Sequence, residues 1–191
     1  MLRFFVVRCP PNGSAPPTLL PNGSFEEGQT TPTSWRIRAG CEWASGEAHH
    51  GKRYLSGRSA KDRVVAESES LALQPKTDYR LHGWLRCPNG EGRLGVDLLN
   101  QQGQIVRQQQ SPRVRGGSEW RYLALECKPE MSETAAREWF RVKGRAGLDD
   151  VGLAFAATSF MGNKALEGDD RKRTSPRGAE PVAAAHGMTN S

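Results

Sequence analysis

Apolar residues in the middle of the chain alternate with polar ones, which is the period of a β-strand rather than of a helix. The clearest case is the segment 79–86. One of its faces carries the candidate core residues Tyr79, Leu81, Gly83 and Leu85. The other face carries Arg80, His82, Trp84 and Arg86. This segment is therefore predicted to be a strand that covers a core on one side only.

The same alternation recurs further along the chain. It predicts strands at 93–98, 120–127, 137–143 and 148–155 and a weaker one at Ile105. Clusters of Gly, Asn, Pro and Gln predict turns at 88–92 and 100–103. Many short strands between turns, without a long helical window, predict an all-β sandwich of two antiparallel sheets.

Three zones differ in composition. Residues 1–19 are rich in Pro and are expected to form a flexible arm, whereas residues 20–157 carry the alternating pattern of the sandwich. Residues 158–191 are small and polar, and such a segment buries too little surface to offset its ordering entropy, so we expect a disordered tail.

Composition narrows the class of protein. No apolar run approaches the roughly 18–20 residues of a membrane span, and the run Phe4–Val7 is shorter than the about 7–15 residues of a signal peptide. We therefore expect no membrane span, and the sequence shows no convincing export signal. The four cysteines have no zinc-binding spacing, and no disulfide is predicted.

The chain carries a formal charge of +6, mostly from arginine. An excess of basic over acidic residues is typical of nucleic-acid-binding proteins. In this chain, however, the arginines are spread along the sequence and accompany no recognition motif. Nucleic acid is therefore not an expected partner.

Six short motifs occur in a fixed order. They are Asn22-Gly-Ser-Phe-Glu26, Trp35, Gly51-Lys52 with Leu55, Tyr79-x-Leu81-x-x-Trp84, Trp120, and Gly147-Leu-Asp-Asp-Val151. This order resembles that of the jelly-roll carbohydrate-binding modules of families four, nine and twenty-two, within the galactose-binding-like superfamily. The resemblance implies a jelly-roll β-sandwich, non-catalytic binding of a polysaccharide or oligosaccharide, and an extracellular or cell-surface location.

The resemblance also implies a structural Ca²⁺ that joins the ends of the domain. The side chains of Glu26 and Asp149 and the carbonyl groups of Ser24 and Lys52 would be its ligands. Calcium takes six to eight oxygen ligands. Some relatives have a further acid where this chain has His49, and plain surface charge remains the alternative for these acids.

Three aromatic residues, Trp84, Tyr122 and Trp139, fall on the side of their strands that faces away from the core. Charged or polar neighbours of the same parity are Arg80, His82, Arg86, Asp97, Glu126 and Arg141. Rings that stack on sugars, next to side chains that bind hydroxyl groups, would form a binding platform. The alternative is that the rings only stabilise the sheet. Trp120 shares the parity and could serve either purpose, and the arginines favour an acidic or sulfated sugar.

No catalytic arrangement of residues is evident. Gly90-x-Gly-x-x-Gly95 matches a dinucleotide-binding pattern but precedes a strand, so a turn is predicted. We therefore expect a binding protein rather than an enzyme. An accessory part of a glycoside hydrolase, or a structural or adhesion module with the same fold, remains the alternative.

Overall fold

The computed structural model describes residues 18–156, which form nine strands and no helix. The strands are β1 (Trp35–Ile37), β2 (Cys41–Ser45), β3 (Arg53–Ser68), β4 (Leu71–Ala72), β5 (Tyr79–Leu99), β6 (Ile105–Gln110), β7 (Val114–Arg115), β8 (Arg121–Cys127) and β9 (Ala135–Phe155). Every pairing between them is antiparallel. The prediction of an all-β fold is confirmed. The predicted tail, and all but the last two residues of the predicted arm, lie outside the described residues.

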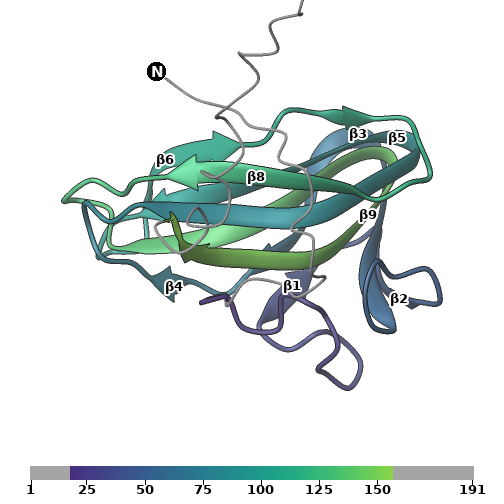
Figure 1. Ribbon diagram of the computed structural model, residues 1–191, viewed down its shortest axis with the longest axis horizontal. Helices are drawn as coiled ribbons and strands as arrows, with labels where there is room; N and C mark the ends of the chain where they lie inside the picture. The colour runs from purple at the N-terminus through teal and green to yellow at the C-terminus, as the bar shows by residue number, and fades with distance from the viewer. Residues whose placement is uncertain (1–17, 157–191) are drawn as a thin grey trace, which may run out of the picture. The chain divides into compact units, whose positions relative to one another are not determined.

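The long strands β5 and β9 pair along almost their entire length and bend together (Figure 1). The bend lies at Gly90 and Gly144, which have φ angles of +148° and +83°. A side chain at either glycine would collide with the backbone of the opposite strand. The predicted turn at 88–92 is therefore wrong, because the chain continues through it as one bent strand. The strands predicted at 137–143 and 148–155 likewise belong to one strand, β9.

Because β3, β5 and β9 bend, each contributes to both layers of a sandwich. The first layer runs β8, the first half of β5, the second half of β9, the first half of β3, and β2. The second layer runs β6, the second half of β5, the first half of β9, the second half of β3, and β1. The short strands β4 and β7 extend the second layer.

The core lies between these layers. A Cβ atom built on Gly83 in the first half of β5 would lie 3.2 Å from Leu94 in its second half, and one on Gly92 would lie 3.1 Å from Leu85. The two halves of one strand therefore pack face to face. Leu81 and Leu85 are fully buried, as the alternation predicts.

The opening motif and the closing motif meet at one edge of the sandwich. The N–H group of Val151 donates a hydrogen bond of 2.8 Å to the carbonyl oxygen of Gly23. A Cβ atom at Gly23 would overlap the carbonyl oxygen of Val151, so this close approach of the two backbones requires glycine. Fully buried Phe25 packs edge-on against Trp35, with ring centroids 5.0 Å apart. The motifs thus hold the ends of the domain together.

Three cysteines of the described part, Cys41, Cys87 and Cys127, are buried free thiols. Burial raises the pKa of Cys87 to about 11 and that of Cys41 and Cys127 to about 12. These thiols therefore stay protonated at neutral pH and belong to the core. Residues 18–156 contain no helix that is long and apolar enough to cross a membrane.

Candidate functional site

The structure divides the nine predicted ligand-binding residues between the outer faces of the two layers. The first layer carries Arg80, His82, Trp84, Arg86, Tyr122 and Glu126, on β5 and β8. The second layer carries Asp97, Trp139 and Arg141, on β5 and β9. The alternation predicted correctly that all nine face away from the core. It did not reveal that the bends in β5 and β9 send the two groups to different surfaces.

On the first layer, rings from distant segments form a continuous surface, which we call the aromatic face: His49, Tyr54, Trp84, Trp120 and Tyr122. Trp84 lies directly opposite Tyr122 in the sheet, with ring centroids 5.4 Å apart at an interplanar angle of 62°. The imidazole of His49 stacks on Trp84 with a centroid distance of 3.7 Å and an angle of 15°. Trp84, Trp120 and Tyr122 are all partly exposed.

Trp120 extends the aromatic face toward Tyr54, with ring centroids 5.8 Å apart. The guanidinium group of Arg86 lies 4.8 Å from the centre of the Trp120 ring and 4.9 Å from that of Tyr54. Its Nη2 atom also pairs with Glu47 at 2.7 Å. Sequence reasoning did not assign Tyr54 to the site, although its position beside buried Leu55 gives it outward parity on β3.

Glycines of β9 make room for these side chains. A Cβ atom at Gly147 would lie 3.2 Å from the Trp120 ring and 3.1 Å from Nε of Arg86. At Gly152 it would collide with the imidazole ring of His82. The rings therefore lie close against the backbone of β9, which fixes their height above the sheet.

A pocket of about 240 Å³ adjoins the aromatic face. Its walls include Tyr54, Arg86, Glu47, Ser118 and Arg145. Tyr54 is only 4% exposed, so the pocket offers mainly donors and acceptors of hydrogen bonds, beside the partly exposed ring of Trp120. Such a combination can hold an apolar ring face while it binds hydroxyl groups at the rim.

Two of the predicted ligand residues are buried beneath this surface. His82 is 3% exposed and Arg80 is 8% exposed. Burial lowers the pKa of His82 to about 4, so its imidazole is neutral at physiological pH. Arg80 pairs with Glu126 at 3.2 Å. His82 lies beside Tyr122, with ring centroids 6.0 Å apart, and Arg80 precedes it by two residues on the same outer side of β5.

The expectation that Trp139 joins Trp84 and Tyr122 in one exposed platform is wrong. Trp139 lies on the other layer and is only 3% exposed. Its indole covers Gly95, and its Nε1 donates a hydrogen bond of 2.9 Å to Asp97. The guanidinium group of Arg141 lies 5.2 Å from the ring centre. The indole is thus packed into the second layer and is not available to stack on a sugar.

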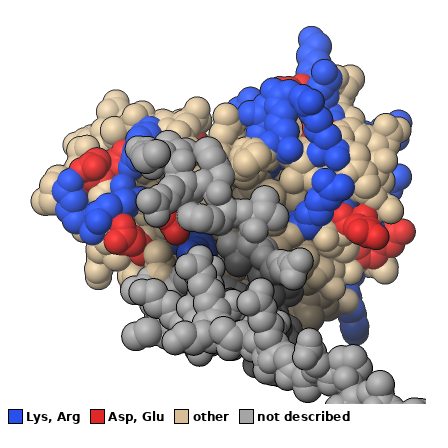
Figure 2. Space-filling model, turned by 45° about the horizontal axis from the view of Figure 1, so that its top comes forward, with Lys and Arg blue, Asp and Glu red and all other residues tan. Residues whose placement is uncertain are grey.

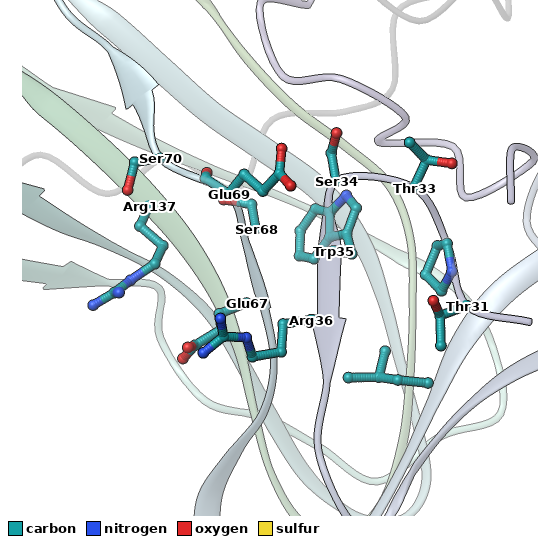
Figure 3. Close-up of a pocket in the computed structure, with 12 residues that line it drawn as sticks. Thr31, Thr33, Ser34, Trp35, Arg36, Glu67, Ser68, Glu69, Ser70 and Arg137 are labelled. Atoms are coloured by element: carbon teal, nitrogen blue, oxygen red, sulfur yellow. Dashed lines mark hydrogen bonds between the residues drawn. The ribbon is translucent and has the colours of Figure 1, made fainter.

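Near Trp139, the second layer borders a larger cavity of about 620 Å³ (Figure 3). Figure 3 shows Trp35 between Thr31 and Thr33 on one side and Arg137 and Ser70 on the other. Within the part of the chain that the structure describes, Nε1 of Trp35 and Nε of Arg137 are buried without a hydrogen-bond partner. No local sequence pattern marks this cavity, because its walls come from a loop and from strands that are far apart in the chain.

Glu138, the neighbour of Arg137, is fully buried. Its Oε2 accepts a hydrogen bond of 2.7 Å from the hydroxyl group of Ser68, which also lines the cavity. Burial raises the pKa of Glu138 to about 6. Desolvation in the sandwich accounts for this shift, so the shift alone does not mark a catalytic acid.

The two predicted calcium-ligand side chains hold the same loop. Oε1 of Glu26 accepts hydrogen bonds from the backbone N–H groups of Lys52 and Arg53, both at 2.7 Å. Oδ2 of Asp149 accepts hydrogen bonds from the N–H groups of His49 at 2.7 Å and His50 at 3.1 Å. Acids from the two ends of the domain thus bind backbone N–H groups of the same short segment, 49–53.

The donor set fits calcium only in part. No group of three His, Cys, Asp or Glu side chains that could hold a metal ion exists among residues 18–156. Two carboxylates and the carbonyls of Ser24 and Lys52 would need water to complete six to eight oxygens. Asp149 is fully buried, and burial raises its pKa to about 7. No Lys or Arg in the described residues forms an ion pair with it. Calcium binding stays a prediction.

Comparisons with known proteins identify the fold. No protein-family model and no curated protein sequence matches the chain. The structure is similar to the enzymatically active domain of tailspike protein 4 of bacteriophage CBA120, with a TM-score of 0.57 and 15% identity over 72% of this chain. The match covers 21% of the tailspike chain.

Two further similar structures are whole binding modules. One is a family 61 carbohydrate-binding module in complex with β-1,4-galactotriose, with a TM-score of 0.54, 17% identity, and coverage of 73% of this chain and 99% of the module. The other is a family 22 xylan-binding domain, with a TM-score of 0.52, 16% identity, and coverage of 71% of this chain and 93% of the domain. The chain therefore has the β-sandwich fold of carbohydrate-binding modules, as the resemblance implied.

Proposed function

We propose that this protein binds carbohydrate without catalysis, and that the aromatic face is the binding surface. The observation that carries the proposal is the gathering of Trp84, Trp120 and Tyr122, all partly exposed, on one outer face beside a polar pocket. Fold similarity alone would not justify this function, because one fold serves many functions.

The chemistry of this face suits a sugar chain. Indole and phenol rings present apolar faces to the C–H groups of a pyranose, which stack on aromatic rings. Arg86, Glu47 and Ser118 then stand at the pocket, where they can bind hydroxyl groups. A polysaccharide or oligosaccharide is therefore the proposed ligand. β-1,4-Galactan and xylan are the first probes, because one similar module is in complex with β-1,4-galactotriose and the other is a xylan-binding domain.

Trp120→Ala and Trp84→Ala test the proposal. For the glycan that the wild-type protein binds, the affinity of each variant should be at least tenfold lower, because the variant lacks a stacking surface. A tenfold loss corresponds to about 1.4 kcal/mol of binding free energy. The measurement is affinity gel electrophoresis or calorimetry on protein whose fold has been checked by circular dichroism. Ile105→Ala is the control, since it also shortens an exposed apolar side chain (49% exposed) but lies on β6.

Failure of the wild-type protein to bind any glycan of a broad panel would contradict the proposed function. Unchanged affinity in both tryptophan variants would contradict the proposed site. If Arg36→Ala or Glu67→Ala abolished binding instead, the ligand would occupy the cavity of Figure 3, which these residues line.

We also propose that Ca²⁺ joins Glu26 to Asp149 across the loop 49–53. The burial of Asp149 supports this, since a bound cation would stabilise the charged form of a carboxyl group with which no Lys or Arg in residues 18–156 pairs. Added Ca²⁺ at about a hundred times its Kd should stabilise metal-free protein by about 2.7 kcal/mol. Thermal melts of the wild type and of Glu26→Gln measure the gain, which the variant should lose.

Glu27→Gln is the matched control for the calcium test, because Glu27 is an adjacent exposed acid with no ion pair in the described residues. It should keep the full calcium-dependent gain. Identical melting curves of the wild type with calcium and with chelator would exclude a structural calcium ion.

A further inference from the structure

Positive charge is unevenly distributed over the surface (Figure 2). A dense group of charges lies where β3, β5 and β9 bend and where β7 pairs with β5. We call it the cationic corner: Arg58, Lys61, Asp62, Glu91, Arg93, Arg113, Arg115, Arg141, Lys143 and Arg145. Eight cations less two acids give a net charge of +6, which equals the net charge of the whole chain. The rest of the chain is thus neutral overall.

Strand geometry brings these charges to the outer side of the bend. Arg141, Lys143 and Arg145 alternate along β9, so all three lie on the outer side of the sheet. Because the bend at Gly144 separates Lys143 from Arg145, the three side chains spread from the second layer to the first. Arg93 lies directly opposite Arg141, and Arg58 lies directly opposite Arg145. Like charges in directly opposed positions destabilise a sheet. Because these opposed arginines do not stabilise the sheet, we infer that they serve a function other than folding.

The two acids neutralise only part of the corner. Asp62 pairs with Arg93 at 3.4 Å and with Arg113 at 3.5 Å. Glu91 pairs with Arg113 at 2.8 Å and with Arg115 at 3.0 Å. Although burial acts against it, the hydrogen bond from Arg115 and the nearby cations lower the pKa of Glu91. Glu91 therefore stays ionised, and both acids hold arginines in place.

The remaining cations of the corner have no acidic partner in the structure described, residues 18–156. They are Arg58, Lys61, Arg141, Lys143 and Arg145. All but Arg141 are exposed. A surface with this excess of uncompensated charge attracts a polyanion.

We propose that the cationic corner binds a polysaccharide that carries carboxylate or sulfate groups. Guanidinium groups bind such anions through two parallel hydrogen bonds. The inference rests on the proposed carbohydrate-binding function. Continuity of the surface supports it, because Arg145 of the corner also lines the pocket beside the aromatic face. A glycan seated on the aromatic face therefore reaches the corner.

An anionic polysaccharide fits better here than a nucleic acid. Sequence-tolerant binding of single strands relies on aromatic side chains interleaved with the basic ones, on which bases stack. The Trp139 ring, which lies 5.2 Å from the guanidinium group of Arg141, is only 3% exposed, so it offers no face on which a base could stack.

The test compares binding to polygalacturonate, a uronate polymer, with binding to neutral β-1,4-galactan. The double variant Arg58→Gln/Lys143→Gln removes two unpaired cations that do not line the pocket. Its affinity for polygalacturonate should fall at least fivefold at low salt, and its affinity for galactan should stay within twofold. The wild type's preference for polygalacturonate should itself decrease as salt is added, since salt screens exposed charges.

Lys76→Gln/Lys128→Gln is the matched control. It changes the net charge equally, but its lysines lie close to the N-terminal end of β5 and the C-terminal end of β8, where they pair with Glu130 and Asp78. It should bind both polymers as the wild type does.

Equal losses in the two double variants would show that only overall charge matters and would overturn the inference. So would tighter binding of duplex DNA than of polygalacturonate. Galactan binding together with a polygalacturonate affinity that does not change in the corner variant would overturn the inference but leave the proposed function intact. If the wild-type protein bound neither polymer and no glycan of a broad panel, the inference and the proposed function would both be overturned.

Discussion

Gly23→Ala should destabilise the domain by about 3 kcal/mol or more, which lowers the melting temperature by roughly 10 °C. A methyl group at Gly23 overlaps the carbonyl oxygen of Val151, which is backbone and cannot move aside without shifting β9. The shift would also break the 2.8 Å hydrogen bond between these residues. Thermal and urea unfolding followed by circular dichroism measure the loss.

Gly103→Asn is the control for Gly23→Ala. Gly103 lies in a turn with a φ angle of +74°, which asparagine tolerates, and a side chain there meets nothing within 4 Å. Its stability should change by about 0.5 kcal/mol or less. If Gly23→Ala were as stable as this control, the close approach of the two ends of the domain would be wrong.

The sequence predicted the fold class because alternation is a local signal. In the first half of β5, Leu81 and Leu85 are buried and Trp84 faces outward, as their spacing requires. The motif order added the meeting of the two ends, where Gly23 contacts Val151. Both features follow from residue type and spacing, so they could be predicted without coordinates.

The bends could not be predicted, because glycine marks both a turn and a bent strand. Gly90 stands in a stretch with Pro, Asn and two more glycines, which is the composition of a turn. What makes it a bend is Gly144 on the paired strand, more than fifty positions away. Only the pairing of β5 with β9 reveals this, and no local pattern contains it.

Only part of the candidate site could be predicted, because the bends decide which residues share an outer face. Parity placed Trp84 and Tyr122 on one outer face, and their strands pair directly. Parity could not place Trp139. Residues continue to alternate between the inner and outer sides of a strand through a bend, but beyond the bend the outer side belongs to the other layer. His49 and Tyr54 reach the site through loop and strand contacts that depend on the tertiary fold.

Trp139→Ala should therefore act on stability, with a loss of about 3–5 kcal/mol. It removes a buried indole from above Gly95, leaves a cavity, and deprives Asp97 of the 2.9 Å hydrogen bond from Nε1. Trp139→Phe keeps most of the ring and should lose about 1–3 kcal/mol, chiefly because the buried carboxylate of Asp97 loses a donor. Urea unfolding of both variants measures these losses.

Trp84→Ala is the comparison that separates the two tryptophans. Trp84 is partly exposed on the aromatic face, so its removal should affect glycan affinity far more than stability. The folded fraction of Trp139→Phe should bind glycan as the wild type does, because Trp139 lies on the other layer. A Trp139→Phe protein of wild-type stability that no longer binds glycan would place the ligand over the second layer, and the aromatic face would then be only a packed surface.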